Sequence, residues 1–516
     1  MDQAEKLYDL LVIGAGPGGY PAALKAAGLG KKVALVEKRD LGGTCLNRGC
    51  IPTKTLLHST ELYREIAGAE RFGIRCSDAV LDEAALWGHK DKTVASLRDG
   101  IAQVLKKQKV EVFQGVGKIV GVTDAAESCA AQQSATAGTG NGKTIVTVAV
   151  QGQDDKTETF KAYHVLIATG SAPASLPIPG FDLPGVLNSD TVLDGDELGV
   201  TLPGDASESG GIIIIGGGVI GMEMTTVYSN LGVPVTVLEA MDRILPGMDK
   251  EIAQNLKMIL KKRGVEIITS ARVTAAEKTE AGMVCHYEQV NRKGETETFS
   301  VTGEKILVSV GRKTNVDGLF AESVIDVYSR EKLFTPKGHI IVDTAYGTII
   351  PGVWAVGDVV GGIQLAHVAT AEGGRAVEDM FGIPYSQNLG VIPSCVYTDP
   401  EIACAGMTAD AAKQLGIDVV TAKYIMSVNG KSVLTLQERG FIKLVAEKSS
   451  GKLVGAQLMC ARATDMIGQV ELAIASEMTA ADLAAVVMAH PTFAEGIGEA
   501  AQALAAEVTA QGAVGK

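Results

Sequence analysis

This 516-residue chain has no long apolar run and no excess of positive charge. No stretch approaches the roughly 18 consecutive apolar residues that a membrane-spanning helix needs. Its 47 lysines and arginines are outnumbered by 60 aspartates and glutamates, and the net charge of −13 disfavours nucleic acid and anionic membranes as partners. The opening residues MDQAEKLYDLLVIG are acidic and lead straight into a strand pattern. We therefore expect no targeting segment and a cytoplasmic protein.

Cysteine is not enriched, and eight in the whole chain is an ordinary number. A reducing compartment would keep most of them as buried thiols, so any disulfide here should be a working one. A metal site would need a second group of ligands at suitable spacing. None stands out, because Cys395 and Cys404 lie apart in sequence and Cys285 and His286 form an isolated pair. We expect no metal.

Two stretches of the chain follow the same β-α-β pattern. Residues 8–13 are an apolar run, followed by the glycine-rich GAGPGG, the helical pattern YPAALKAAGLG and the second apolar run KKVALVE. Residues 211–239 repeat this order with GIIII, GGGVIG, MEMTTVYSNLG and PVTVLE. Two such units predict two nucleotide-binding domains of the α/β class.

The glycines of each turn have the spacing that a pyrophosphate-binding turn needs. They are Gly14, Gly16 and Gly19 in the first unit and Gly216, Gly218 and Gly221 in the second. Glu37 and Glu239 end the following strands at equal offsets from the first glycine, where a carboxylate can hold ribose hydroxyls. Both units are therefore predicted to bind a dinucleotide. Because a carboxylate repels a 2′-phosphate, Glu239 favours NAD over NADP, although Arg243 nearby is an opposing signal.

Two other parts of the chain differ from these units in composition and in hydrophobic pattern. Residues 121–143 are small and polar and predict a long surface loop. After about residue 385, strand patterns such as FIKLVAE and KLVGAQLMC alternate with helical ones, which predicts a third domain of the α+β type. We divide the chain into residues 1–175, 176–308, 309–385 and 386–516, the third segment belonging with the first.

The segment GGTCLNRGCIPTK brings Cys45 and Cys50 close together. A disulfide between them would close a short loop and stabilise the fold by only about 2 kcal/mol, so it is a poor structural bridge. Pro52 suits the first turn of a helix, which would set Cys50 at the positive end of the helix dipole, and Lys54 adds positive charge. Both effects lower a thiol pKa and favour a redox role. Two adjacent buried thiols remain the alternative.

This segment resembles the redox-active disulfide of the class I pyridine nucleotide-disulfide oxidoreductases. The resemblance extends from about residue 7 to about residue 505 through GGGVIGME, VLIATGSAPASLP, VGRKTN, TIIPGVWAVGDVVGG and AHPTFAEG. It implies an α/β fold with two Rossmann-like dinucleotide-binding domains and a C-terminal α+β dimerisation domain. FAD would be bound by residues 1–175 and 309–385, and NAD by residues 176–308, while residues 386–516 would form the dimer.

The resemblance also implies roles for single residues. Cys45 and Cys50 would be the redox pair, His490 the catalytic base and Glu495 its orienting carboxylate. Lys54 would pair with Glu223 near the flavin, although spacing alone favours a solvated lysine on a helix. The remaining residues that the resemblance assigns to cofactor binding are Gly14, Gly16, Gly19, Glu37, Thr169, Gly170, Gly216, Gly218, Gly221, Glu239, Gly311 and Asp358.

The activity so implied is oxidation of dihydrolipoyl to lipoyl groups, with electrons passing through the two cysteines and FAD to NAD+. The partners would be a second copy of this chain, whose Cys45 would face His490, and a lipoyl carrier of a 2-oxoacid dehydrogenase or glycine cleavage complex. A glutathione- or mercuric-reductase-like enzyme is the alternative, but the first would prefer NADP and the second needs a C-terminal cysteine pair that VTAQGAVGK lacks. A non-catalytic redox flavoprotein would need neither His490 nor Glu495.

Overall fold

The computed structural model describes residues 6–76, 79–124, 144–195, 197–203, 210–291 and 293–514. The chain forms two compact units. The first contains Met1–Pro52, Trp87–Pro173 and Arg312–Leu389, and the second contains Thr53–Leu86, Ala174–Gly311 and Gly390–Lys516. No described helix is long and apolar enough to cross a membrane.

The first unit is built on a seven-stranded sheet with β1 (Leu7–Ile13) at its centre. The strand order is β3-β2-β1-β6-β5-β4, with β17 beside β6. The other strands are β2 (Val33–Glu37), β3 (Glu111–Gln114), β4 (Val116–Asp124), β5 (Thr144–Gln151), β6 (Thr157–Ile167) and β17 (Val353–Ala355). Strands β1, β2, β3, β6 and β17 run parallel, as buried apolar runs joined by helical crossovers require. The first predicted β-α-β unit is therefore present.

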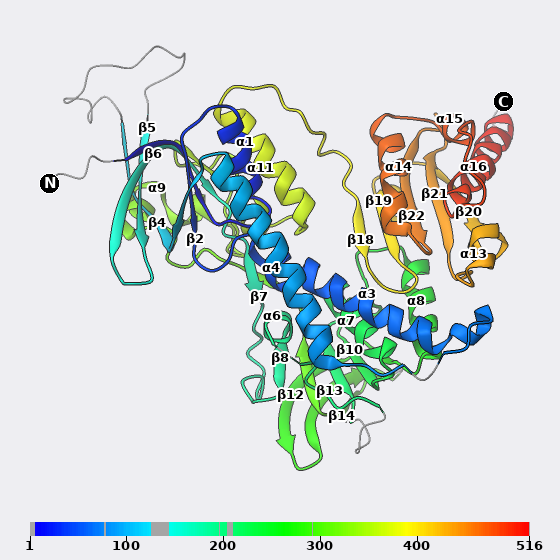
Figure 1. Cartoon of the computed structure of the whole chain (residues 1–516). Helices are drawn as coiled ribbons and strands as arrows, with labels where there is room; N and C mark the ends of the chain where they lie inside the picture. The colour runs from blue at the N-terminus through cyan, green and yellow to red at the C-terminus, as the bar shows by residue number, and fades with distance from the viewer. Residues whose placement is uncertain are drawn as a thin grey trace. The chain divides into compact units, whose positions relative to one another are not determined.

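Helices α1 (Tyr20–Gly28) and α11 (Ala366–Met380) lie side by side on this sheet (Figure 1). Alanines form the buried face of α1, which allows a close approach to the strands. The unit also contains or shares α2 (Gly43–Arg48), α3 (Cys50–Ala67), α4 (Glu83–Lys107), β7 (Ser171–Pro173), β16 (Arg312–Thr314), α9 (Glu322–Tyr328), α10 (Arg330–Leu333) and the 3-10 helix η2 (Gly357–Val360). The prediction of a surface loop over residues 121–143 is wrong for residues 121–124, which complete β4 and pair with β5. Residues 125–143 lie outside the described residues.

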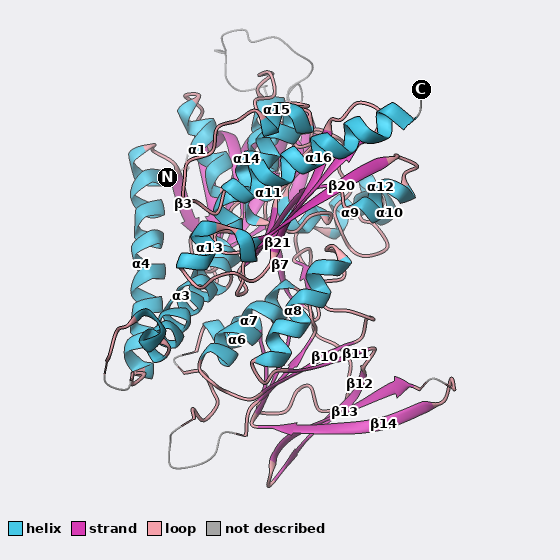
Figure 2. Cartoon of the chain, turned by 90° about the vertical axis from the view of Figure 1, so that its right-hand side faces the viewer, coloured by secondary structure: helices cyan, strands magenta, loops and turns pink. Residues whose placement is uncertain are grey.

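The second unit repeats the β-α-β design around β9 (Ile212–Ile215), α7 (Val219–Asn230) and β10 (Val235–Glu239). Its parallel sheet has the order β11-β10-β9-β15-β8. The further elements are η1 (Ala69–Phe72), β8 (Val186–Asn188), α6 (Ser189–Leu193), α8 (Lys250–Lys262), β11 (Glu266–Thr269) and β15 (Lys305–Val308). A three-stranded antiparallel sheet is inserted before β15 and consists of β12 (Arg272–Thr279), β13 (Gly282–Val290) and β14 (Thr296–Gly303) (Figure 2).

The C-terminal part of this unit is the predicted α+β structure. Its antiparallel sheet has the order β18-β19-β22-β21-β20, and α14 and α16 pack on it (Figure 2). The core face carries Ile442, Leu444 and Ala446, which alternate along β21. The elements are β18 (Ser394–Val396), β19 (Ile402–Gly406), α12 (Ala409–Gln414), β20 (Val419–Ile425), η3 (Met426–Val428), α13 (Gly430–Leu434), β21 (Phe441–Glu447), β22 (Leu453–Met459), α14 (Ala463–Ala475), α15 (Ala480–Ala484) and α16 (Glu495–Val514). The predicted fold class is confirmed.

One histidine of the first unit makes its stability depend on pH. The ring of His164 in β6 lies 5.2 Å from that of Trp354 and 5.3 Å from that of Phe381, and burial lowers its pKa to about 4. Unfolding returns this pKa to about 6.5, so the unfolded chain binds a proton that the folded chain excludes. The contribution of the neutral His164 to the free energy of unfolding is fully present above pH 6.5. It decreases as the pH drops towards 4, by up to about 3 kcal/mol.

We therefore expect the substitution His164→Phe to reduce the acid lability of the protein. The urea midpoint of unfolding, measured from pH 7 to pH 4, should fall less for this variant than for the unsubstituted protein. His89→Gln, at an exposed position of α4, is the control and should leave the pH dependence unchanged. Equal losses in the His164→Phe variant and the parent would contradict the prediction.

Candidate functional site

The first glycine turn, after β1, requires glycine at its first position. Gly14 has a φ of +102°, and a Cβ on it would lie 2.3 Å from the carbonyl oxygen of Ala168. The carboxylate of Glu37, at the end of β2, accepts hydrogen bonds from Ala15 N at 2.7 Å and Arg39 N at 2.8 Å. The strand end, the turn and the buried acid thus form one rigid group.

The second glycine turn has the same construction. Gly216 has a φ of +105°, and a Cβ on it would lie 2.5 Å from Ser309 O. Glu239, at the end of β10, accepts from Gly217 N at 2.5 Å and Met241 N at 2.6 Å. The two acids at equal offsets therefore occupy equivalent positions in the two units.

Both turns have room and donors for a pyrophosphate. A Cβ on Gly218 would meet no atom within 4 Å, and one on Gly16 would meet only Gly43 Cα, at 3.9 Å. The helices that follow, α1 and α7, have no side-chain cap at their first turns. A phosphate can accept hydrogen bonds from the free N–H groups of these first turns, and the positive end of each helix dipole attracts its negative charge. The residues present fit a dinucleotide at each turn.

The two cysteines lie in residues 42–50 (the cysteine loop), which comprise the short helix α2 and the start of α3 and pack on the first glycine turn. Cys45 is in α2 and Cys50 is the first residue of α3, an 18-residue helix, and both are half-buried. Gly43 has a φ of +59°, and a Cβ on it would lie 2.6 Å from Gly16 Cα. The loop backbone therefore contacts the turn backbone directly. The sequence predicted this helix start, which places the Cys50 thiol at the positive end of the dipole.

The backbone at Gly49 approaches Cys45 closely. A Cβ on Gly49 would lie 3.3 Å from Cys45 Cα, so a side chain at this position would push the backbone at Cys45 away by a few tenths of an ångström. Burial raises the pKa of the Tyr20 phenol, and charge on the Cys45 sulfur adds to the effect, so the two groups are electrostatically coupled. Tyr20 begins α1, the helix that follows the glycine turn.

A polar chain connects this loop to Asp358, a predicted cofactor ligand at the start of η2. Asp358 accepts a short hydrogen bond from the hydroxyl of Ser171. Arg312 Nε donates to that hydroxyl oxygen at 2.7 Å, and its Nη2 lies 3.5 Å from Thr44 Oγ1, next to Cys45. Sequence reasoning missed Arg312 and Ser171, although both stand inside the motifs VGRKTN and VLIATGSAP that it singled out.

The predicted residues Thr169 and Gly170 are fixed by Asn315 in the same unit. Thr169 Oγ1 donates to Asn315 O at 2.8 Å, Asn315 Nδ2 donates to Thr169 O at 2.9 Å, and Asn315 N donates to Gly170 O at 2.9 Å. Gly311, with a φ of +124°, accepts from Ala174 N at 3.0 Å at the edge of the second unit. These hydrogen bonds lie next to the paired strands β7 and β16 and hold the segments that flank the two strands together.

Lys54 and Glu223 form an ion pair within the second unit. Lys54 Nζ donates to both carboxylate oxygens, at 2.9 and 2.7 Å. Glu223, on α7, is buried and also accepts from Tyr397 N at 3.1 Å, while Lys54 Nζ lies 4.6 Å from the centre of the Tyr397 ring. Lys54 is thus not the solvated helix lysine that spacing alone favoured. Its place beside a flavin stays a prediction.

His490 and Glu495 form the predicted pair near the C-terminus. His490 Nδ1 lies 2.7 Å from Glu495 Oε1, and Glu495 Oε2 accepts from Thr492 N at 2.7 Å. The Thr492 N–H, and after it His490, lower the pKa of the Glu495 carboxyl. The imidazole is held firmly yet its side chain is 78% exposed, so it is open to another molecule. The cysteine loop belongs to the other unit, and the distance from His490 to a cysteine stays a prediction.

Among the residues that the structure describes, no group of three or more histidine, cysteine, aspartate and glutamate side chains is arranged to hold a metal ion. His286 instead pairs with Glu277, at 3.1 Å. The predicted opposing signal Arg243 donates to Pro246 O at 2.9 Å, within the loop that follows Glu239.

Comparisons with known proteins agree with this geometry. Residues 8–373 match the model of the family described as pyridine nucleotide-disulphide oxidoreductase, and residues 392–501 match the dimerisation domain of that family. Dihydrolipoyl dehydrogenase of Bacillus subtilis is 37% identical over 96% of this chain and 98% of its own length. The enzyme of that name from Geobacillus stearothermophilus is 38% identical over 96% and 95%. The crystal structure of LpdA from Mycobacterium tuberculosis superposes with a TM-score of 0.79 at 26% identity, covering 97% of this chain and 99% of that one.

Proposed function

We propose that this chain, which belongs to the pyridine nucleotide-disulphide oxidoreductase family, oxidises dihydrolipoyl groups to lipoyl groups and reduces NAD+. The observation that carries the proposal is the contact between Gly43 and Gly16, which builds a pair of cysteines directly onto a dinucleotide turn. Relatives named dihydrolipoyl dehydrogenase that match nearly the whole chain support the choice of substrate. FAD at the first turn would supply two-electron transfer between the cysteine pair and NAD+ at the second.

The cysteines carry out a thiol–disulfide exchange. One substrate thiol loses its proton to His490, and the resulting thiolate attacks Cys45 Sγ. A substrate–Cys45 disulfide forms as the Cys45–Cys50 bond breaks, and the electron pair leaves on Cys50 as a thiolate. The second substrate thiol then attacks the first substrate sulfur and gives its proton to the departing Cys45 sulfur, which closes the lipoyl disulfide and releases Cys45 as a thiol. The substrate loses two electrons and the cysteine pair gains them.

The electrostatics of the chain suit each partner in this exchange. The Cys50 thiolate lies at the start of α3, where the helix dipole stabilises negative charge. Glu495 binds Nδ1 of His490, which leaves Nε2 to take the proton and stabilises the imidazolium that forms. Asp358, held by Ser171 and Arg312, would be a further group that holds FAD.

We place NAD-binding in residues 176–308, FAD-binding in residues 1–175 and 309–385, and dimer formation in residues 386–516. The match of residues 392–501 to a dimerisation domain supports a homodimer, in which His490 would serve Cys45 of the partner. A lipoyl carrier domain of a 2-oxoacid dehydrogenase or glycine cleavage complex is the proposed source of substrate, and the cytoplasm the proposed location.

The test is an assay of the purified, FAD-loaded protein with dihydrolipoamide and either NAD+ or NADP+. We expect NAD+ reduction, with kcat/KM for NAD+ roughly 100-fold above that for NADP+. Like charges about 4 Å apart repel by up to about 4 kcal/mol near a protein surface, and Glu239 would face the 2′-phosphate. NADPH-dependent reduction of glutathione disulfide without dihydrolipoamide oxidation, or equal kcat/KM for the two nucleotides, would overturn the proposal.

A further inference from the structure

The loop 240–248, which follows Glu239, is packed against the second glycine turn. Leu245 N donates to Gly217 O at 2.8 Å, and a Cβ on Gly217 would lie only 2.8 Å from Ile244 Cγ2. Ile244 and Leu245 are fully buried. Any displacement of this loop would therefore displace the turn and the ribose-binding acid.

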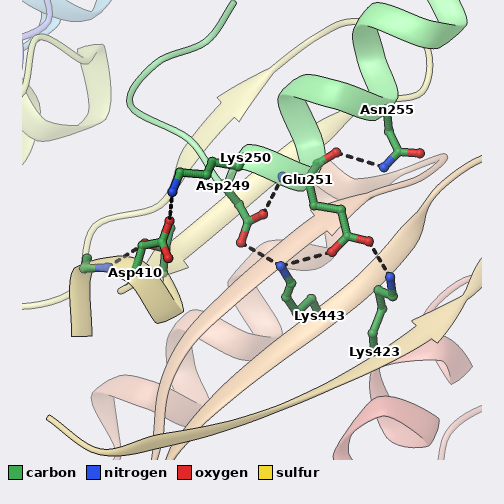
Figure 3. Close-up of polar contacts among 9 residues, drawn as sticks. Asp249, Lys250, Glu251, Asn255, Asp410, Lys423 and Lys443 are labelled. Carbon is green, nitrogen blue, oxygen red and sulfur yellow. Dashed lines mark hydrogen bonds and ion pairs between the residues drawn. The ribbon is translucent and has the colours of Figure 1, made fainter. Parts of the chain in front are cut away.

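The far end of the loop is attached to the C-terminal sheet through α8. Asp249 caps this helix by accepting from Glu251 N at 2.8 Å, and its second oxygen accepts from Lys443 Nζ of β21 at 2.8 Å (Figure 3). Lys443 also pairs with Glu251 at 3.2 Å, and Lys423 of β20 binds the other oxygen of Glu251. Figure 3 shows the two lysines reaching the first turn of α8 from the strands below it.

The centre of this cluster, the pair of Lys443 and Asp249, is shielded from solvent. The side chains of Lys443 and Asp249 are only 15% and 10% exposed. Burial opposes the charge on Lys443, yet the hydrogen bonds and charges of Asp249 and Glu251 outweigh it and raise the pKa of the ammonium. Burial likewise opposes the charge on Glu251, and Lys423 and Lys443 together lower its pKa. Both shifts favour the charged forms of Lys443 and Glu251, so the attraction between them holds the first turn of α8 against β21.

The other end of α8 is attached to the same C-terminal region. Arg263, the C-cap of the helix, donates to Asp399 Oδ2 at 2.5 Å, and Arg64 binds the same oxygen. Asp399 follows β18. Residues beyond 390 therefore hold both ends of α8, the helix that directly follows loop 240–248.

We propose that Lys443 is a positioning residue for NAD, through which the C-terminal domain sets the affinity of the second glycine turn for its nucleotide. Without the ammonium, the carboxylates of Asp249 and Glu251 repel each other, the first turn of α8 relaxes, and loop 240–248 loosens on Gly217. The inference rests on the proposed NAD site. The cysteine exchange uses residues of the other unit and His490, and is not affected.

The experiment measures the binding of ADP-ribose, which has the adenosine and pyrophosphate of NAD but cannot be reduced. Titration calorimetry on the FAD-loaded protein should give a Kd about tenfold higher for Lys443→Met than for the parent. KM for NAD+ should rise in parallel. The kcat at saturating NAD+ and the rate at which dihydrolipoamide reduces the protein should not change.

Lys452→Met is the matched control. It removes an ion pair of the same domain, Lys452 with Glu477 at 2.6 Å, that does not involve α8, and it should leave ADP-ribose binding unchanged. Asp249→Asn is the second test variant, because asparagine still caps the helix while its charge is gone, and it should weaken binding in the same direction.

Two different results would count against the proposal and can be told apart. Parent-like ADP-ribose affinity in both Lys443→Met and Asp249→Asn, even with a lowered melting temperature, would show a merely structural cluster. Failure of the unsubstituted protein to bind ADP-ribose would instead contradict the proposed NAD site itself.

Discussion

Replacing Cys50 with serine is expected to reduce turnover of dihydrolipoamide with NAD+ by at least about 10³-fold, because serine cannot form the disulfide that the substrate opens. We expect two-electron reduction of the parent to produce a long-wavelength absorption band, and the variant should lack it. Such a band needs a thiolate donor beside the oxidised flavin, and we expect Cys50, at the first turn of α3, to be that donor.

The matched variant is Cys45→Ser, which should lose turnover to the same degree while its Cys50 remains available as a thiolate. Absorption spectra of both variants, recorded during titration with base and again during stepwise reduction, separate the two roles. A Cys50→Ser protein that keeps the band, or a Cys45→Ser protein that never shows it, would reverse the assignment within the pair.

Loss of the imidazole in His490→Ala should reduce turnover by about 10²- to 10⁴-fold, the usual contribution of a positioned general base. The geometry of the pair is compatible with this role, since His490 Nδ1 lies 2.7 Å from Glu495 Oε1 while the imidazole stays largely exposed. Glu495→Gln should have a smaller effect and should alter the pH profile of kcat/KM, because the amide no longer stabilises the imidazolium.

Complementation then tests whether the base serves the neighbouring chain. Inactive Cys45→Ser and His490→Ala subunits, mixed under conditions that allow exchange, should form dimers with one intact site and up to about half of parental activity. If labelled subunits exchange and no activity returns, His490 serves its own chain. The same conclusion follows if a stable monomer turns over at the full rate.

The local parts of this architecture could be read from the sequence. The β-α-β units follow from short apolar runs and glycine spacing, and the equal offsets of Glu37 and Glu239 anticipated their equivalent hydrogen bonds to Ala15 N and Gly217 N. These features depend on residues close together in the chain, whose geometry is set by backbone sterics.

The long-range parts could not be read in this way. Nothing in the pattern around Thr44 indicates that Arg312 approaches it, and nothing in FIKLVAE indicates that its lysine binds the cap of α8. Such pairs depend on how distant segments fold together, and a lysine on an amphipathic strand is usually solvated. For Lys54, resemblance supplied the partner Glu223 that spacing alone did not.

The close approach of Gly43 to Gly16 has a consequence for reading mutational screens. A methyl group at residue 43 would be forced against the backbone of the first glycine turn, so it must push the cysteine loop and the turn apart together. Loss of flavin and loss of disulfide exchange would then occur in the same clones. A screen for disulfide-deficient variants that still retain flavin should therefore recover changes at Cys45 and Cys50 but none at Gly43.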